Sequence, residues 1–216
     1  MSQLDAQSPR RALVVIDVQM EYFTGSLRID YPPVEQTLPN IARAMDGAQA
    51  AGIPVVVVQH SAPSDWPVFA RGSAPWQLHP DVANRPRSHF IEKNNASVYS
   101  GTDFAAWLES QGIDTLTVVG YMTHNCDAST IVEAAHRGLQ VEWLQDASGA
   151  LPYANEAGQA SAEEIHRVFS VVFQTGFAAV GSTAAWLEAV QAGKVLPKSN
   201  ILVSNQAAVA AAVQAG

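Results

Sequence analysis

The chain has 216 residues, of which 48% are hydrophobic and 15% charged, and it carries a formal net charge of -8. This composition excludes a disordered chain and supports a large core. The acidic balance, without any run of Lys or Arg, argues against nucleic acid or an anionic membrane as a partner. We expect a single domain over residues 1–216, with its core over about 10–193 and a C-terminal tail over 194–216.

The single cysteine of the chain, Cys126, cannot form an internal disulfide, so nothing in the sequence is typical of a secreted, disulfide-bonded fold. The N-terminal segment MSQLDAQSPRR lacks the apolar stretch of a secretory signal. The first apolar run, ALVVIDV, is too short to span a membrane and contains an acid. These features predict a cytoplasmic protein.

The first half of the chain alternates between strand-like and helix-like segments. The pattern predicts a strand over 12–19, a helix over 41–52 that ends at a glycine, and a buried strand over 53–60. Residues 61–87 are rich in proline and predict an irregular segment, which a short strand over 88–93 follows.

The second half continues this alternation. It predicts, in chain order, a helix over 101–112, a strand over 114–120, a helix over 126–138, a strand over 139–147, a helix that opens at a capping box over 161–164, a strand over 177–182 and a helix over 183–193. Beyond Lys194 the pattern is weaker, and the AAVAAAVQAG end predicts a short helix.

Strands that alternate with helices predict βαβ units, and hence an α/β fold of three layers in which helices cover both faces of a parallel sheet. Continuous apolar strands such as VVVV agree with burial on both faces. In such sheets ligands bind outside the carboxyl ends of the strands, near the point where the strand order reverses. Polar residues at strand ends are therefore the candidates for function.

Three residues stand at such positions. Asp17 follows the apolar run Val-Val-Ile, and it is either a loop anchor or a general base with a tuned pKa. Lys93 ends the third strand, and it is either a surface charge or the partner of a buried acid. Cys126 is either a small buried hydrophobe or a nucleophile in the first turn of a helix, where the helix dipole would lower its pKa.

The stretches VVIDVQ, IEKNNASVY and VVGYMTHNC together resemble the isochorismatase-like cysteine hydrolases over about residues 12–182. The resemblance rests on an acid after the first strand, a lysine after the third and G-x-x-T-x-x-C after the fourth. It implies the isochorismatase-like hydrolase fold, which is Rossmann-like, with a six-stranded parallel sheet of order 3-2-1-4-5-6. It also implies an Asp-Lys-Cys triad, here Asp17, Lys93 and Cys126.

The same resemblance implies a non-proline cis peptide bond between Tyr121 and Met122, which would aim the Met122 amide, with that of Cys126, at a developing oxyanion. Gly120 would permit a tight approach of the turn, and Thr123 would anchor it through its hydroxyl. The implied activity is hydrolysis of a C-N bond in a small amide or ureido compound through a covalent thioester. The resemblance and the apolar tail also predict a homo-oligomer, either a dimer or a tetramer.

Two alternatives remain open. A metal-dependent nicotinamidase would carry Asp-x-His after the second strand, but Val58 stands two residues before His60, so we expect neither a metal nor another cofactor. Isochorismatases proper cleave a vinyl ether and lack the nucleophilic cysteine. A catalytically silent binding protein of the same fold is the other alternative, although no glycine-rich nucleotide-binding motif follows the first strand.

The substrate is not evident from the sequence. Aromatic residues in segments that should surround the site are the candidates for an apolar wall of the pocket: Tyr22, Phe23, Trp66, Phe69, Trp76 and Tyr121. Among these, Phe23, Trp66, Trp76 and Tyr121, together with His124 beside Cys126, are the candidates for substrate contacts. Because Trp66 and Trp76 lie in the irregular segment, that segment is the candidate lid.

Overall fold

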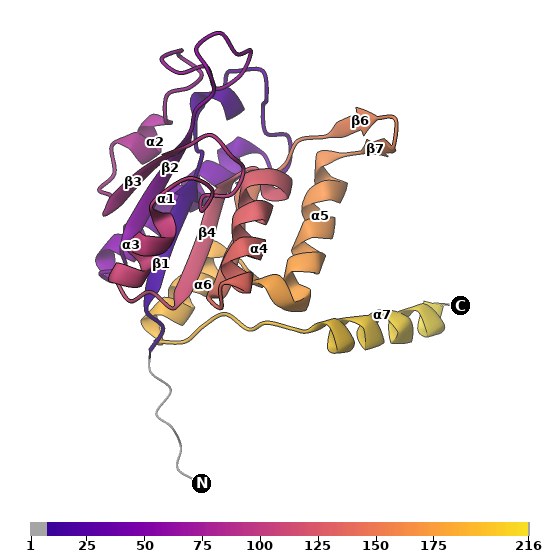
Figure 1. The fold of residues 1–216 in the computed structure, drawn as a ribbon. Coiled ribbons are helices and arrows are strands. Elements are labelled where there is room, and N and C mark those ends of the chain that lie inside the picture. Colours follow the sequence, from indigo (N-terminus) through magenta and orange to yellow (C-terminus); the bar gives the residue numbers. More distant parts are fainter. Residues whose placement is uncertain (1–7, 216) are drawn as a thin grey trace.

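A six-stranded parallel sheet forms the centre of this computed structural model, which describes residues 8–215 (Figure 1). Its strands, in chain order, are β1 (Arg11–Ile16), β2 (Val55–His60), β3 (His89–Lys93), β4 (Thr115–Tyr121), β5 (Gln140–Gly149) and β8 (Ala179–Gly181). The spatial order is β3-β2-β1-β4-β5-β8. This is the predicted order 3-2-1-4-5-6, because β8 is the sixth strand of the sheet. The predicted three-layer α/β fold is confirmed.

Helices cover both faces of the sheet (Figure 1). On one face pack α1 (Val34–Ala50) and α6 (Thr183–Gln191), and on the other α3 (Phe104–Ser110), α4 (Ala128–His136) and α5 (Ala162–Val172). Every residue of β1 and β4 is buried, which explains why these strands are continuous apolar runs rather than alternating ones. Ser161 caps α5 in the predicted capping box with Glu164.

Two elements differ from the sequence-based expectation. Helix α1 begins at Val34 rather than at residue 41 and contains Pro39. Pro39 is the sixth residue of the helix, beyond the first turn, so α1 contains it at the expense of one backbone hydrogen bond. A hairpin of β6 (Tyr153–Asn155) and β7 (Gly158–Ala160) forms a separate two-stranded sheet that the sequence did not predict.

The irregular segment over 61–87 contains one short helix, α2 (Pro80–Ala83). A 3-10 turn over Met20–Tyr22 meets this segment, since the amides of Met20 and Glu21 donate to carbonyls of residues 77 and 75. The loops after β1 and β2 are thereby joined above the carboxyl edge of the sheet, where they enclose the candidate site.

The C-terminal tail ends in a helix, α7 (Ile201–Ala215), which projects away from the rest of the chain (Figure 1). None of the helices over residues 8–215 is both long and apolar enough to cross a membrane. The N-terminal segment that supports the predicted cytoplasmic location lies, over residues 1–7, outside the described part of the chain.

Candidate active site

The three predicted residues meet at the carboxyl edge of the sheet. Asp17 directly follows β1, Lys93 is the last residue of β3, and Cys126 lies in a π-helical turn over Thr123–Asp127 that joins β4 to α4. Because β1 and β4 are neighbours at the reversal of the strand order, Asp17 and Cys126 flank the position where this class of sheet binds ligands.

The ammonium group of Lys93 joins the other two side chains. Its Nζ atom donates to Asp17 Oδ2 at 2.7 Å and lies 3.3 Å from Cys126 Sγ. The side chains of Asp17 and Lys93 are fully buried, and Cys126 is 5% exposed. The second Asp17 oxygen, Oδ1, has no hydrogen-bond partner among the described residues, so it is free to accept a proton.

His60, at the end of β2, is a fourth member of this cluster that the sequence did not indicate as such. Its Nδ1 lies 3.2 Å from Lys93 Nζ, and Asn95 O accepts from the same ammonium at 3.0 Å. Burial, together with the charge of Lys93, lowers the pKa of His60, so its ring is neutral and can accept the hydrogen bond. Sequence analysis considered His60 only as part of an Asp-x-His metal motif that lacks its aspartate.

The electrostatics of the cluster favour an ammonium on Lys93 and a neutral thiol on Cys126. Burial would lower the pKa of Lys93, but the Asp17 carboxylate and the Cys126 sulfur outweigh it and raise that pKa. Burial and the Asp17 charge raise the pKa of Cys126, with Lys93 acting in the opposite direction. The expected lowering by a helix dipole is therefore wrong in direction, because burial and a carboxylate dominate.

The turn that carries Cys126 depends on Gly120. Gly120 has a φ of 118°, and a Cβ atom there would lie 2.1 Å from the carbonyl oxygen of Ile16. Only glycine therefore allows β4 to approach β1 beside Asp17. The peptide bond between Tyr121 and Met122 is cis.

Hydrogen bonds fix both ends of this turn. Thr123 Oγ1 lies 2.9 Å from Nδ1 of His166 on α5. Thr130 Oγ1 on α4 donates to the carbonyl of Cys126 at 2.8 Å. Met122 lies between strand and turn, and its amide makes no backbone hydrogen bond within the described chain. The amide of Met122 is thus free to bind another acceptor.

The residues predicted to contact substrate separate into two groups. Tyr121 is fully buried and its hydroxyl pairs with Thr37 at 2.6 Å, while Phe23 packs edge-on against it with ring centroids 6.0 Å apart. Trp76 donates to Ser61 at 2.7 Å and supports the loop after β2. In contrast, Trp66 is 57% exposed and makes no aromatic contact within residues 8–215.

His124, the remaining candidate, is half-buried in the turn that carries Cys126. Neither of its ring nitrogens has a hydrogen-bond partner among residues 8–215, and burial lowers its pKa to about 4. Its ring packs edge-on against Tyr153 from the unpredicted hairpin, with centroids 4.9 Å apart. The Tyr153 hydroxyl in turn lies 3.7 Å from Met122 Sδ. Tyr153 therefore borders the turn that carries Cys126, although its polar surroundings in the sequence gave no indication of it.

Two further aromatic residues that the sequence placed around the site, and Gln19, which sequence analysis missed, support the loops of the site. Tyr22 and Phe69 pack edge-on, with centroids 5.3 Å apart, and Phe69 also packs against His60. The amide side chain of Gln19 donates to the carbonyls of His60 and Trp76 at 2.9 and 2.7 Å, and accepts from His60 N at 2.8 Å. Gln19 thus ties the loops after β1 and β2 together. The position of Gln19, two residues after Asp17, was the one sequence feature that could have indicated this role.

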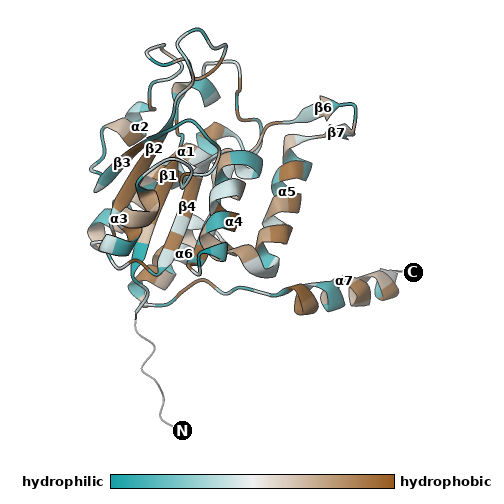
Figure 2. Cartoon of the chain, viewed as in Figure 1, coloured by the Kyte–Doolittle hydropathy of each residue, from teal (hydrophilic) through white to brown (hydrophobic). Residues whose placement is uncertain are grey.

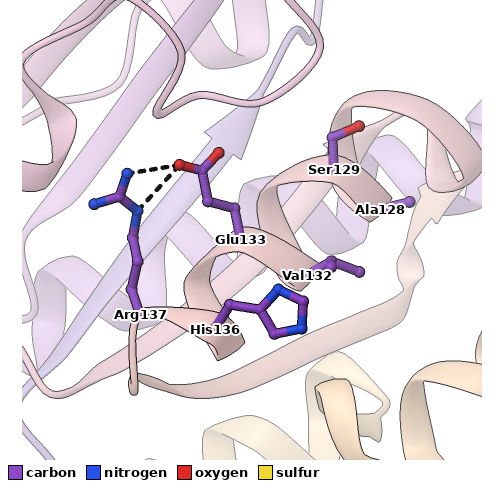
Figure 3. Close-up of a pocket in the computed structure, with 6 residues that line it drawn as sticks. All are labelled: Ala128, Ser129, Val132, Glu133, His136 and Arg137. Atoms are coloured by element: carbon purple, nitrogen blue, oxygen red, sulfur yellow. Dashed lines mark hydrogen bonds and ion pairs between the residues drawn. The ribbon is translucent and has the colours of Figure 1, made fainter.

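Two surface hollows differ in their relation to this cluster. One, of about 600 Å³, is lined by Lys93 at the end of β3 and by residues of the loops after β2 and β3, including Ser61 and Asn94. The other lies on the outer face of α4, where Glu133 and Arg137 form an ion pair (Figure 3). Because the first hollow borders Lys93, it is the candidate route to the buried cluster.

A family model for the isochorismatase domain matches residues 11–183 of this chain. A crystal structure from Burkholderia xenovorans LB400 that carries the isochorismatase name is 61% identical, with a TM-score of 0.94, and the match covers 95% of this chain and 99% of that one. The chain therefore belongs to the isochorismatase family, and the predicted membership is confirmed.

Curated relatives are more distant. The secreted isochorismatase effector Isc1 of Verticillium dahliae is 31% identical over 67% of this chain and 75% of its own length. The ureidoacrylate amidohydrolase RutB of Methylobacterium radiotolerans is 25% identical over 82% of this chain and 78% of its own length. The family thus includes amidohydrolases, which supports a hydrolase of C-N bonds.

Proposed function

We propose that this protein is a cysteine hydrolase that cleaves a C-N bond of a small amide or ureido compound through a thioester on Cys126. One observation carries the proposal: a single buried ammonium, that of Lys93, contacts both the Asp17 carboxylate and the Cys126 sulfur. A carboxylate that can take the thiol proton, a nucleophilic sulfur and a cation that stabilises two anions are what acyl transfer requires. The ureidoacrylate amidohydrolase among the relatives supports the bond type.

The first half-reaction forms the thioester. Asp17 accepts the proton of the Cys126 thiol, and the thiolate sulfur attacks the carbonyl carbon of the substrate. The resulting oxyanion accepts hydrogen bonds from the amides of Met122 and Cys126. When the C-N bond breaks, protonated Asp17 gives its proton to the leaving nitrogen, so ammonia or an amine departs. Lys93 keeps its proton and stabilises the charges on Asp17 and Cys126 throughout.

The second half-reaction releases the acid. Water attacks the thioester carbonyl while Asp17 accepts one of its protons. The same two amides stabilise the second oxyanion. When the C-S bond breaks, the acyl group leaves as an acid and the proton on Asp17 returns to the Cys126 sulfur. The net reaction consumes one water for each C-N bond cleaved.

The proposal can be tested by trapping the thioester. A panel of small amides and ureido acids is incubated with the protein, quenched in acid, and analysed by intact-protein mass spectrometry. We expect a mass increase equal to the acyl group of the substrate minus the one hydrogen that the thiol loses, on a peptide that contains Cys126. Cys126→Ala should give neither adduct nor turnover, and Cys126→Ser should lose most of both. Normal turnover by Cys126→Ala would disprove covalent catalysis at this residue.

The residues that could ligate a metal give less support to the alternative of a metal-dependent nicotinamidase. Among the described residues, the only cluster with metal-ligating potential joins Asp17, His60 and Cys126, whose ligand atoms lie within 4.8 Å of one another. The Lys93 ammonium already contacts all three side chains. We therefore expect full activity after treatment with a chelator. Loss of activity that zinc or manganese restores would favour the nicotinamidase alternative, and a complete lack of turnover would favour a silent binding protein.

A further inference from the structure

Helix α7, called the arm below, leaves most of its apolar side chains in solvent. Its large hydrophobic residues are all more than half exposed: Ile201 76%, Leu202 64%, Val203 54%, Val209 56% and Val213 77%. Figure 2 shows brown, apolar segments along an arm that projects from the body. A helix of 15 residues is marginally stable in water without a packing surface. The arm therefore requires a surface that its own chain does not supply in this arrangement.

The segment that leads to the arm is firmly held. Arg11 donates to the carbonyl of Lys194, and the amide of Leu196 donates to the buried Glu142 carboxylate at 3.0 Å. The carbonyl of Pro197 accepts from Gln174 at 3.1 Å. Leu196 is 4% exposed, so the chain is anchored up to the base of α5. These contacts fix the position from which the arm leaves the rest of the chain.

A second unpartnered apolar surface lies on α5. Val168, Val171 and Val172 are 47%, 60% and 43% exposed. Their spacing of three and four residues places them on one side of the helix, which we call the valine face. The other side of α5 packs on the core through His166 and Phe169. Each chain thus carries both an apolar arm and an apolar face with nothing covering either among residues 8–215.

The size of the arm favours a second copy as the occupant, and its lack of charge does not oppose one. The chain has a net charge of -8, so two copies repel each other, but the arm contains no ionisable side chain. The arm spans about 22 Å and buries on the order of 300 Å² on each side of a contact, so two reciprocal contacts bury on the order of 1,200 Å², the lower limit for a specific interface. A reciprocal contact closes with twofold symmetry and leaves no free arm.

We propose that two copies of the chain exchange arms, so that α7 of each packs on the valine face of the other. This arrangement covers both apolar surfaces with one symmetric contact. It does not involve the cluster around Lys93, so it holds or fails independently of the proposed function.

Light scattering on the full chain gives the first test. We expect twice the 23.0 kDa mass of one chain at micromolar concentration. Val171→Asp on the valine face and Val213→Asp on the arm should each raise the dimer dissociation constant about a hundredfold or more, because an ionised carboxylate would lose its hydration without a partner. Trp66→Asp is the matched control, since Trp66 is 57% exposed and lies on neither surface. It should leave the dimer intact.

Crosslinking then identifies the contact. In a Cys126→Ser background, chains with Val168→Cys, Val171→Cys or Val172→Cys are mixed with chains that carry Val209→Cys or Val213→Cys, and disulfides are mapped under oxidising conditions. We expect crosslinks between an α5 cysteine and an arm cysteine of different chains. In a chain that carries both, mass spectrometry distinguishes a bond within one chain from a bond between two.

Four results would overturn the proposal. The first is a monomeric wild-type protein. The second is a dimer that neither Val171→Asp nor Val213→Asp weakens. The third is a dimer that only the arm variant weakens, which would place the arm elsewhere on the partner. The fourth is a crosslink that forms only within one chain, which would show that the arm folds back onto its own α5.

Discussion

Lys93 donates a 2.7 Å hydrogen bond to Asp17, and the side chains of both residues are completely withdrawn from solvent. A buried ion pair gains little net stability over apolar packing, but removal of one partner leaves the other charge buried without compensation. The pair therefore makes the stability of the sheet edge depend on the same two residues that we assign to catalysis.

Lys93→Ala should impair both stability and activity. We expect the free energy of unfolding to fall by about 3–5 kcal/mol, because the Asp17 carboxylate loses its cation. We also expect kcat/KM to fall nearly as far as in Cys126→Ala, since members of one catalytic unit are not additive. Urea denaturation and steady-state kinetics measure the two effects. Lys194→Ala, at an exposed lysine, is the control. Full activity in a folded Lys93→Ala protein would contradict the assignment.

His60→Ala should reduce kcat/KM about tenfold, the effect of one lost hydrogen bond to the Lys93 ammonium. The fold should be largely retained, because His60 is not fully buried. His136→Ala, at an exposed histidine on α4, should leave kinetics unchanged. Equal kinetics for both variants would mean that the 3.2 Å contact between His60 and Lys93 has no part in the reaction.

The reactivity of Cys126 should report its raised pKa. Because burial and Asp17 favour the neutral thiol, iodoacetamide should modify it slowly at pH 7, and the rate should rise about tenfold per pH unit up to pH 9. A free thiol, with a pKa of about 8.5, begins to level off within that range. Mass spectrometry of the modified peptide follows the rate. A plateau near pH 7 would show that a thiolate is already present at neutral pH.

Asp127, the residue after Cys126, should make stability fall as pH rises. It is fully buried, and burial raises its pKa to about 7 even though Trp143 donates to it. Its unfolded pKa is about 3.9, so between these values the folded state keeps a proton that the unfolded state has lost. The stabilisation is therefore complete below about pH 4. It is lost as pH rises to about 7.

Asp127→Asn removes this dependence. We expect urea midpoints measured from pH 4 to pH 8 to change less than in the wild type. The variant should be the more stable protein at pH 8, by a few kcal/mol, because an amide carries no buried charge. Parallel pH profiles for the two proteins would refute the assignment of this slope to Asp127.

Gly120→Ala should destabilise the fold by about 3 kcal/mol or more, since its Cβ meets Ile16 backbone atoms and its φ is positive. Gly138→Ala is the matched control. Gly138 also has a positive φ, of 87°, but a Cβ there meets no atom within 4 Å. The control should cost about 1–2 kcal/mol, from the strained φ alone. Similar urea midpoints for the two variants would mean that close packing against β1 is not what requires glycine.

Much of the fold could be predicted because buried parallel strands leave a continuous apolar pattern in the sequence. The runs before Asp17 and Gly120 identified β1 and β4 in this way. The order of the strands did not come from these runs, since any βαβ repeat permits several orders, and it required the family resemblance. The position of Asp17 at a strand end was readable because a buried carboxylate after Val-Val-Ile demands a partner.

What the sequence could not show depends on contacts between distant segments. The bond from His60 to Lys93 joins neighbouring strands and has no local pattern. Tyr153 reaches the turn that carries Cys126 from a short polar hairpin without strand-like alternation. The direction of the Cys126 pKa shift depends on how deeply the thiol is buried beside Asp17, which a helix-start position alone does not reveal.

The buried carboxylate of Glu142 also bears on how the chain is made. It accepts hydrogen bonds from residues contributed by widely separated parts of the chain: Arg11, Thr117, Trp186 and Leu196. Because the ribosome releases the chain from its N-terminus, Arg11 is available long before Glu142, and Leu196 emerges after both. The set is complete only after Leu196 has emerged. The native surroundings of this carboxylate therefore cannot form before the segment at Leu196 has left the ribosome.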